Sequence, residues 1–189
     1  MKKKKKQVLS KMDIIEIRAR RFAALVIDWY LTNMLAVIPI TFYFRGGDYL
    51  KPHMFELQEY SFYIGLLLGL YAIVVGIIYY TVIPTFVWKG QTLGKKLCKV
   101  KVVQEDETDI TYKTMFIREM LGATLLEGGI VMTAAYLRKL LPLFNLAQFV
   151  TPLQYIAYAL TLLSIAYAYF KPKSQAFHDK VAKTIVIKK

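Results

Sequence analysis

Two acidic residues, Asp28 and Glu127, stand inside long apolar segments of the sequence. A charged carboxylate in a membrane-spanning helix costs on the order of a few kcal/mol, so it should face protein or water and have a partner. Arg21 precedes Asp28 by two helical turns and lies on the same helix face. These residues suit an ion or proton site, or an anchor for a substrate. The alternative is a structural buried ion pair, or a hydrogen bond to a neighbouring helix.

The depths of the two acids also match. Asp28 lies about 9 Å into its apolar segment, and Glu127 lies about 13 Å from Arg118, where a later helix is expected to start. If the acids face each other, repulsion and loss of water favour a shared proton or a bound cation. Equally, Glu127 could face a wet crevice beside Gly128 and Gly129.

Composition indicates the class of protein that holds these residues. The chain has 189 residues, is 56% hydrophobic and carries a formal net charge of +13, which suits a membrane protein whose charge lies in its loops. Long apolar segments separate the lysines, so we expect no nucleic-acid partner. The single Cys98 excludes an intrachain disulfide, and the two histidines lack zinc-ligand spacing. No motif indicates enzyme catalysis, and we expect no metal or cofactor.

Four apolar segments are long enough to cross a ~30 Å hydrocarbon core as helices. They cover about 22–44, 61–88, 119–137 and 144–170. We therefore predict an all-α membrane bundle of four transmembrane helices, forming a single domain over 1–189. The lysine-rich start resembles a signal peptide, but further charged residues precede the apolar run and no cleavage site follows, so the first helix should be retained.

Lysine and arginine are unevenly distributed between the two sides of this bundle. Most precede the first helix, including those of a polybasic arm at 1–20, or lie in the loop 89–118 and the tail 171–189. The exceptions are Arg45, Lys51, Arg138 and Lys139. The positive-inside rule therefore places both termini in the cytoplasm. Lys2–Lys6 should bind the anionic headgroups of the lipid bilayer.

The loop and the tail also carry strand patterns. Residues 97–103 alternate with many β-branched side chains, 105–109 form a polar turn, and the tail is β-rich near its end. We predict a small cytoplasmic-surface β-sheet from the 97–112 loop and the 183–188 tail, with the tail pairing against a loop hairpin. The alternative is disordered basic tails lying on lipid headgroups.

Four motifs, taken in order, resemble those of the RDD family of bacterial membrane proteins. They are Arg21-Phe22-x-Ala24-x-x-Ile27-Asp28, then Gly90-x-Thr92-x-Gly94-Lys95 followed by Val100 to Val103, then Arg118-Glu119, and last His178-Asp179-x-x-Ala182-x-Thr184-x-Val186. The resemblance covers about 15–187. The family is named after one arginine and two aspartates, which match Arg21, Asp28 and Asp179. The acidic turn at 105–109 departs from relatives that often have a glycine there, which questions a tight hairpin.

This resemblance implies a compact, multi-pass protein of a bacterial plasma membrane with a suspected transport role. Some relatives are linked to sodium/proton exchange. It also suggests a polar cluster at the cytoplasmic surface that ties the tail to the first helix and serves as a structural latch. The residues of this cluster are Thr92, Lys95, Arg118, His178 and Asp179.

The leading hypothesis is a small transporter that exchanges a cation for protons through Asp28. It would work as a homo-oligomer, because four helices leave only a narrow pathway. The alternative is a non-transporting scaffold or assembly factor that binds anionic lipid or a protein partner. Transport predicts that neutralising Asp28 abolishes flux without unfolding, whereas the scaffold predicts an effect on stability or partner recovery alone.

Overall fold

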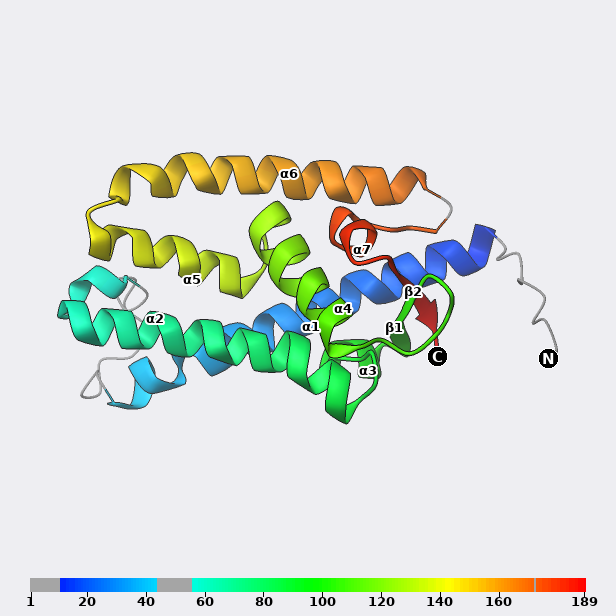
Figure 1. Ribbon diagram of the computed structural model, residues 1–189, viewed down its shortest axis with the longest axis horizontal. Coiled ribbons are helices and arrows are strands. Elements are labelled where there is room, and N and C mark those ends of the chain that lie inside the picture. Colours follow the sequence, from blue (N-terminus) through cyan, green and yellow to red (C-terminus); the bar gives the residue numbers. More distant parts are fainter. Residues whose placement is uncertain (1–10, 44–55, 172) are drawn as a thin grey trace.

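The computed structural model describes residues 11–43, 56–171 and 173–189, which are mostly helical. Long helices run along the molecule, and a two-stranded sheet lies near the C-terminal end of the chain (Figure 1). Within these residues, three helical segments are long and apolar enough to cross a membrane: Met12–Pro39, Phe62–Val87 and Ala147–Phe170. A bent pair makes a fourth if its two parts are one span: Tyr112–Glu127 and Met132–Phe144.

The first helix, α1, runs over Lys11–Tyr43 and so begins well before the predicted residue 22. The predicted arm at 1–20 is therefore helical from residue 11 onward, while Lys2–Lys6 lie outside the described residues. Charged side chains support this extension, since Glu16 pairs with Arg20 one turn later at 2.8 Å. The buried side of α1 carries small and polar residues four apart: Ala24, Asp28, Thr32 and Ala36.

The second apolar segment forms α2 (Phe62–Ile77), which continues as the π-helical η3 (Ile78–Val87). Small residues on α2 let the neighbouring helix α5 (Met132–Leu140) approach closely. A Cβ atom at Gly69 would lie 2.5 Å from Leu140 Cδ2. The core at this end joins α1, α2 and α5 through buried side chains that include Ala36, Ala72 and Met132.

The prediction of one continuous third helix at 119–137 is wrong. The segment begins with α4 (Tyr112–Phe116), continues as the π-helical η4 (Ile117–Glu127), and stops at Gly128. Gly128 has φ +66°, a left-handed conformation that glycine adopts without strain and that ends helices. The chain resumes as α5 and the short η5 (Leu141–Phe144), and the two halves are bent by 56°.

The fourth apolar segment forms α6 (Val150–Phe170), preceded by the single turn η6 (Ala147–Phe149). The predicted start at residue 144 is too early, because Asn145 has φ +60° and closes a turn after η5. Most large apolar side chains of α6 are exposed, which suits a helix that faces lipid.

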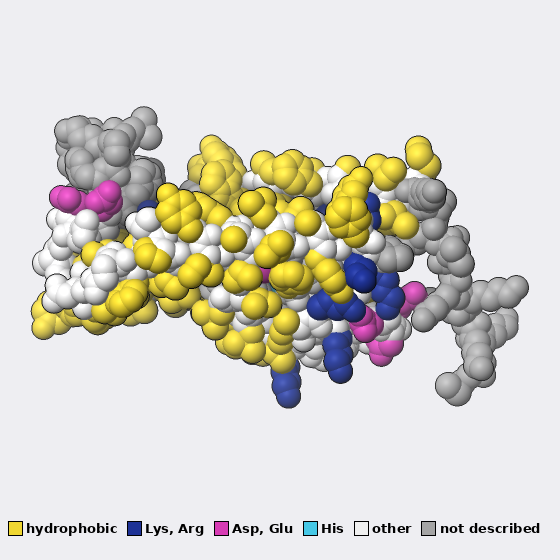
Figure 2. Space-filling model, turned by 90° about the horizontal axis from the view of Figure 1, so that it is seen from above, with side chains coloured by type: hydrophobic (Ala, Val, Ile, Leu, Met, Phe, Trp, Pro, Cys, Tyr) yellow, Lys and Arg dark blue, Asp and Glu magenta, His cyan; other side chains and the backbone are white. Residues whose placement is uncertain are grey.

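The sheet pairs β1 (Val100–Gln104) with β2 (Thr184–Lys188) in antiparallel register, with Val102 opposite Val186. The loop and the tail therefore pair as predicted, but the loop hairpin is wrong. Thr111 instead caps α4, since its side chain accepts a hydrogen bond from Thr114 N. In Figure 2, apolar side chains cover the middle of the visible face, and basic side chains gather toward the sheet end.

Candidate functional site

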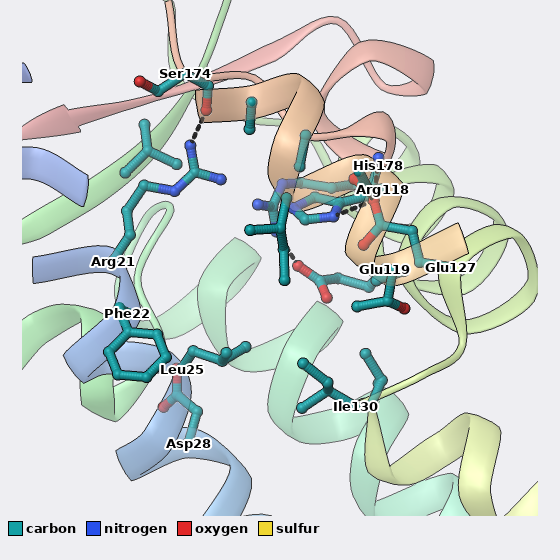
Figure 3. A pocket seen from close by; sticks show the side chains of 18 of the residues that line it. Arg21, Phe22, Leu25, Asp28, Arg118, Glu119, Glu127, Ile130, Ser174 and His178 are labelled. Atoms are coloured by element: carbon teal, nitrogen blue, oxygen red, sulfur yellow. Dashed lines mark hydrogen bonds and ion pairs between the residues drawn. The ribbon is translucent and has the colours of Figure 1, made fainter. Parts of the chain in front are cut away.

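A cavity of about 330 Å³ lies between α1, η4, α6 and the short helix α7 (Phe177–Val181). Much of its wall is apolar, with Phe22 and Leu25 on α1 and Ile165 on α6. Charged groups lie on both sides of the cavity, with Arg21 on α1 across from Arg118, Glu119 and Glu127 (Figure 3). The charged or titratable residues that line the cavity include Arg18, Arg21, Asp28, Lys95, Arg118, Glu119, Glu127 and His178.

Asp28 is 2% exposed and joins three parts of the chain. Its Oδ1 accepts hydrogen bonds from Tyr79 Oη at 2.5 Å and from Gly94 N at 2.8 Å. Its Oδ2 accepts one from Thr92 Oγ1 at 2.5 Å. Thr92 also caps α3 (Leu93–Leu97), and a Cβ atom at Gly94 would lie 2.7 Å from Asp28 Oδ1. Asp28 therefore fastens α3 to α1 through a carboxylate whose two oxygens are both occupied.

Lys95 projects from α3 beside this carboxylate. Its Nζ lies 3.8 Å from Asp28 Oδ2 and 3.4 Å from Thr92 Oγ1. Burial lowers the pKa of Lys95, and the negative charge of Asp28 opposes that shift only in part. Lys95 is therefore a part-buried amine with long polar contacts, and it lines the cavity.

Arg21 does not reach Asp28, although both lie on one side of α1. Its guanidinium instead contacts Asp179 Oδ2 at 2.6 Å and Ser174 O at 2.5 Å. Arg118 holds the other carboxylate oxygen of Asp179 through Nη2 at 2.8 Å and Nε at 3.1 Å. Burial alone would raise the pKa of Asp179, but the charges of Arg21 and Arg118 hold it well below its usual range. This ion network joins α1, η4 and α7.

The five residues predicted as one polar cluster divide into two groups. Arg118 and His178 contact Asp179, which also binds Arg21, whereas Thr92 and Lys95 contact Asp28. The division has a physical cause, because α3 packs on α1 while α7 packs on η4. The close packing of α7 against η4 requires Gly122, because a Cβ atom there would lie 2.6 Å from the Cα atom of His178 on α7.

Glu127 is the last residue of η4 before the break. Its Oε1 accepts hydrogen bonds from Ser164 Oγ at 2.7 Å and from His178 N at 2.9 Å, and it lies 2.9 Å from His178 Nδ1. No described residue contacts its Oε2 with a hydrogen bond or an ion pair. The predicted facing pair with Asp28 does not form, because each acid has its own partners and the cavity lies between them.

A second cavity of about 190 Å³ lies on the other side of the helix break, against α5 and α6. Arg138 lines it, and its Nη1 donates to Gly128 O at 2.8 Å, which satisfies a carbonyl at the break. Glu127 lines both cavities. Glu127 is thus shared by two cavities at the break in the helix.

Sequence analysis missed several residues of this arrangement. Tyr79 and Ser164 donate to the two buried acids, Arg138 caps the break, and Glu119 pairs with Arg118. A signal was available for Ser164, since it is a polar residue within an apolar helix. No local pattern could show which acid Tyr79 would meet.

Apolar helices of membrane-spanning length around a buried network of ion pairs define an integral membrane protein. Comparison with known families then gives a closer assignment. The RDD family matches residues 18–183, and the chain belongs to that family, as its motifs predicted. No curated protein and no solved structure matches the chain.

Proposed function

We propose that this protein is a small transporter that exchanges a cation for protons. The observation that carries the proposal is the position of Glu127, which ends one half of a bent helix and lines a cavity on each side of the break. Non-helical backbone at membrane depth is tolerated where it lines a cavity, and broken helices build ion and substrate sites in many transporters.

In this proposal Glu127 binds the exchanged ion. Its Oε1 is held by Ser164 and His178, while its Oε2 remains available on the cavity side. Exchange requires only that a proton and the cation compete for this carboxylate. The ion network of Arg21, Arg118 and Asp179 holds α7, and with it the backbone N–H of His178, against η4.

Asp28 has a positioning role in this scheme. A cation bound directly to Asp28 would compete with the hydrogen bonds from Tyr79, Thr92 and Gly94. Instead, Asp28 fixes α3 and keeps Lys95 at the cavity wall. This assignment moves the exchange site from the acid that the sequence favoured to Glu127.

We further propose a bacterial plasma membrane location with the sheet end and both termini in the cytoplasm. The distribution of lysine and arginine supports this orientation. Contact between Lys2–Lys6 and anionic headgroups, and assembly into a homo-oligomer, belong to the same proposal. Assembly would cover part of the exposed apolar surface of α6.

Proton flux in proteoliposomes tests the proposal. A trapped pH dye would report flux driven by gradients of sodium, lithium, potassium and a panel of organic cations. We expect cation-dependent flux in the wild type, its loss in Glu127→Gln, and its retention in Glu59→Gln, which neutralises an exposed acid outside both cavities. Gln can still accept the hydrogen bonds of Ser164 and His178 through its carbonyl oxygen, so Glu127→Gln should fold.

A folded wild type that moves protons with none of these cations would contradict transport. The scaffold hypothesis would then lead. It is favoured by the ion network, which latches the tail to α1 through Arg21 and Asp179 and would present a fixed surface to a partner. Recovery of the same partner with wild type and Glu127→Gln would support it.

A further inference from the structure

The larger cavity opens on a side of the molecule that is apolar. Phe22 and Trp29 on α1, and Ile165 and Tyr169 on α6, line the cavity and also keep much of their surface exposed. In a membrane, exposed apolar side chains of long helices face hydrocarbon. The cavity can therefore be entered from the bilayer between α1 and α6.

The arginines that line the cavity are already engaged in contacts within the protein. Arg21 contacts Asp179 and Ser174, and Arg118 contacts Asp179 and Glu119. Arg18, near the opening, donates to Tyr169 O and Ser174 Oγ. These guanidinium groups have little capacity left for an anionic ligand.

The acidic groups, in contrast, keep free oxygens. Every polar contact of Glu127 in the described part of the chain goes to Oε1, and so does the contact of Glu119 with Arg118. Glu119 is 5% exposed and Glu127 is 7% exposed, and both line the cavity. On a residue that is largely removed from water, a carboxylate oxygen without a protein partner favours a cation.

Two further charged or titratable groups face these acids. Lys95 from α3 is balanced by Asp28 at 3.8 Å, and His178 from α7 lies 2.9 Å from Glu127 Oε1. On the far side of the break, Arg138 from α5 donates to Gly128 O. None of these contacts occupies Oε2 of Glu127, so that oxygen remains the best acceptor for an incoming positive charge.

We infer that the larger cavity binds an amphiphilic organic cation, an ammonium or phosphonium ion with apolar substituents, whose charge lies at Glu127. The volume of about 330 Å³ suits a small organic molecule. A bare alkali cation would need several oxygen ligands to replace its hydration shell, and a mostly apolar wall offers few. The inference rests on the proposed exchange for its transport step and names the class of cation.

Binding of tetraphenylphosphonium to the purified protein in detergent tests this inference independently of transport. Isothermal titration calorimetry would compare wild type, Glu127→Gln and the exposed control Glu59→Gln. We expect binding in the wild type and the control, and an affinity lower by about tenfold or more in Glu127→Gln, the effect of losing one charged contact.

A second pair of variants tests the apolar wall without changing any charge. Ala168 lines the cavity, whereas Ala166 is exposed on the same helix outside it. Ala168→Phe should fill the cavity and weaken tetraphenylphosphonium binding by about tenfold or more, while Ala166→Phe should bind as the wild type does. This pair remains informative if Glu127→Gln folds poorly.

The outcomes separate the two proposals. Absence of tetraphenylphosphonium binding by a folded wild type, or equal weakening by Ala168→Phe and Ala166→Phe, would overturn the inference. Sodium-driven proton flux would still support exchange in that case. Conversely, the protein could bind tetraphenylphosphonium, with weaker binding in Glu127→Gln and Ala168→Phe, and yet move no cation. That result would support an amphiphilic cation as the ligand and would contradict a transport function.

Discussion

Asp28 and Glu127 are both buried acids in apolar helices, yet their carboxylates are held differently. Both oxygens of Asp28 accept hydrogen bonds, from Tyr79 and Gly94 on one side and Thr92 on the other. Among the described residues, all the polar contacts of Glu127 go to one oxygen, and the other has none. Burial is therefore similar, but spare hydrogen-bonding capacity differs.

Occupied and free carboxylate oxygens distinguish an acid that stabilises the fold from one that can bind a ligand. An acid whose oxygens are both occupied contributes stability, because its removal strands several buried donors. An acid with a free oxygen can exchange a proton for another cation while its remaining bonds keep it in place. Folding stability of variants at each acid tests that distinction.

The largest effect should come from Asp179, the most completely held acid. It is fully buried between Arg21 and Arg118, so Asp179→Asn leaves the part-buried Arg21 without a counter-charge and leaves the buried Arg118 with Glu119 alone. We expect a loss of about 3–5 kcal/mol in the free energy of unfolding. Denaturant titration in detergent, followed by circular dichroism, measures it. Asp109→Asn, which breaks an exposed pair with Lys101, is the control and should change little.

The same residue gives a pH dependence with a definite sign. The pKa of Asp179 is lower in the folded chain than in the unfolded one, so its contribution is complete above the unfolded value of about 3.9. It is lost progressively as the pH falls below that value. The stability of the wild type should therefore fall toward that of Asp179→Asn in acid. A constant difference between them down to the lowest accessible pH would contradict this account.

The next largest loss of stability should come from Asp28→Asn, and Glu127→Gln provides the direct comparison. Asp28→Asn replaces one of the two accepting oxygens with an N–H₂ group, which cannot accept a hydrogen bond. This change should lower the free energy of unfolding by about 1–3 kcal/mol. Glu127→Gln keeps an acceptor for Ser164 and His178 and should cost below about 1 kcal/mol. Parallel thermal and denaturant unfolding in one detergent would measure both. Equal losses would remove the distinction between the two acids.

Much of this architecture could be predicted from the sequence, because it depends on local composition. Long apolar runs gave the approximate positions of the helices, and alternation of β-branched residues indicated β1 and β2. The break in the helix after Glu127 was harder to predict from the sequence. Two adjacent glycines suggested a crevice, but hydrophobicity alone favoured a continuous helix through them.

The pairing of charges was harder to predict, because it depends on which helices meet. Arg21 and Asp28 share one side of α1, yet Arg21 finds its partner on α7 and Asp28 finds its partners on η3 and α3. Depth along a helix says nothing about rotation relative to a neighbour. Matching the depths of Asp28 and Glu127 therefore located both near one cavity and could not show that each is held separately.

The smallest effect on stability should come from substituting Lys95. This substitution tests whether the charge of Lys95 is needed to hold the carboxylate of Asp28 in place. Because burial lowers the pKa of Lys95, the protonated form is disfavoured in the fold, and the 3.8 Å contact with Asp28 offsets that only in part. Lys95→Met should therefore change the unfolding free energy by at most about 1 kcal/mol. Lys96→Met, at an exposed neighbour that lies over the Trp88 ring, is the matched control.

The pH dependence of Lys95 sharpens this last test. A lowered pKa means that the unfolded chain binds more protons below the usual lysine value of about 10.4, so the wild type should gain stability as the pH rises toward it. Lys95→Met should lack this gain, and Lys96→Met should keep it. A large loss in Lys95→Met at neutral pH would instead mean that the charge of Lys95 is needed to hold Asp28, and that hydrogen bonds from Tyr79, Thr92 and Gly94 do not suffice.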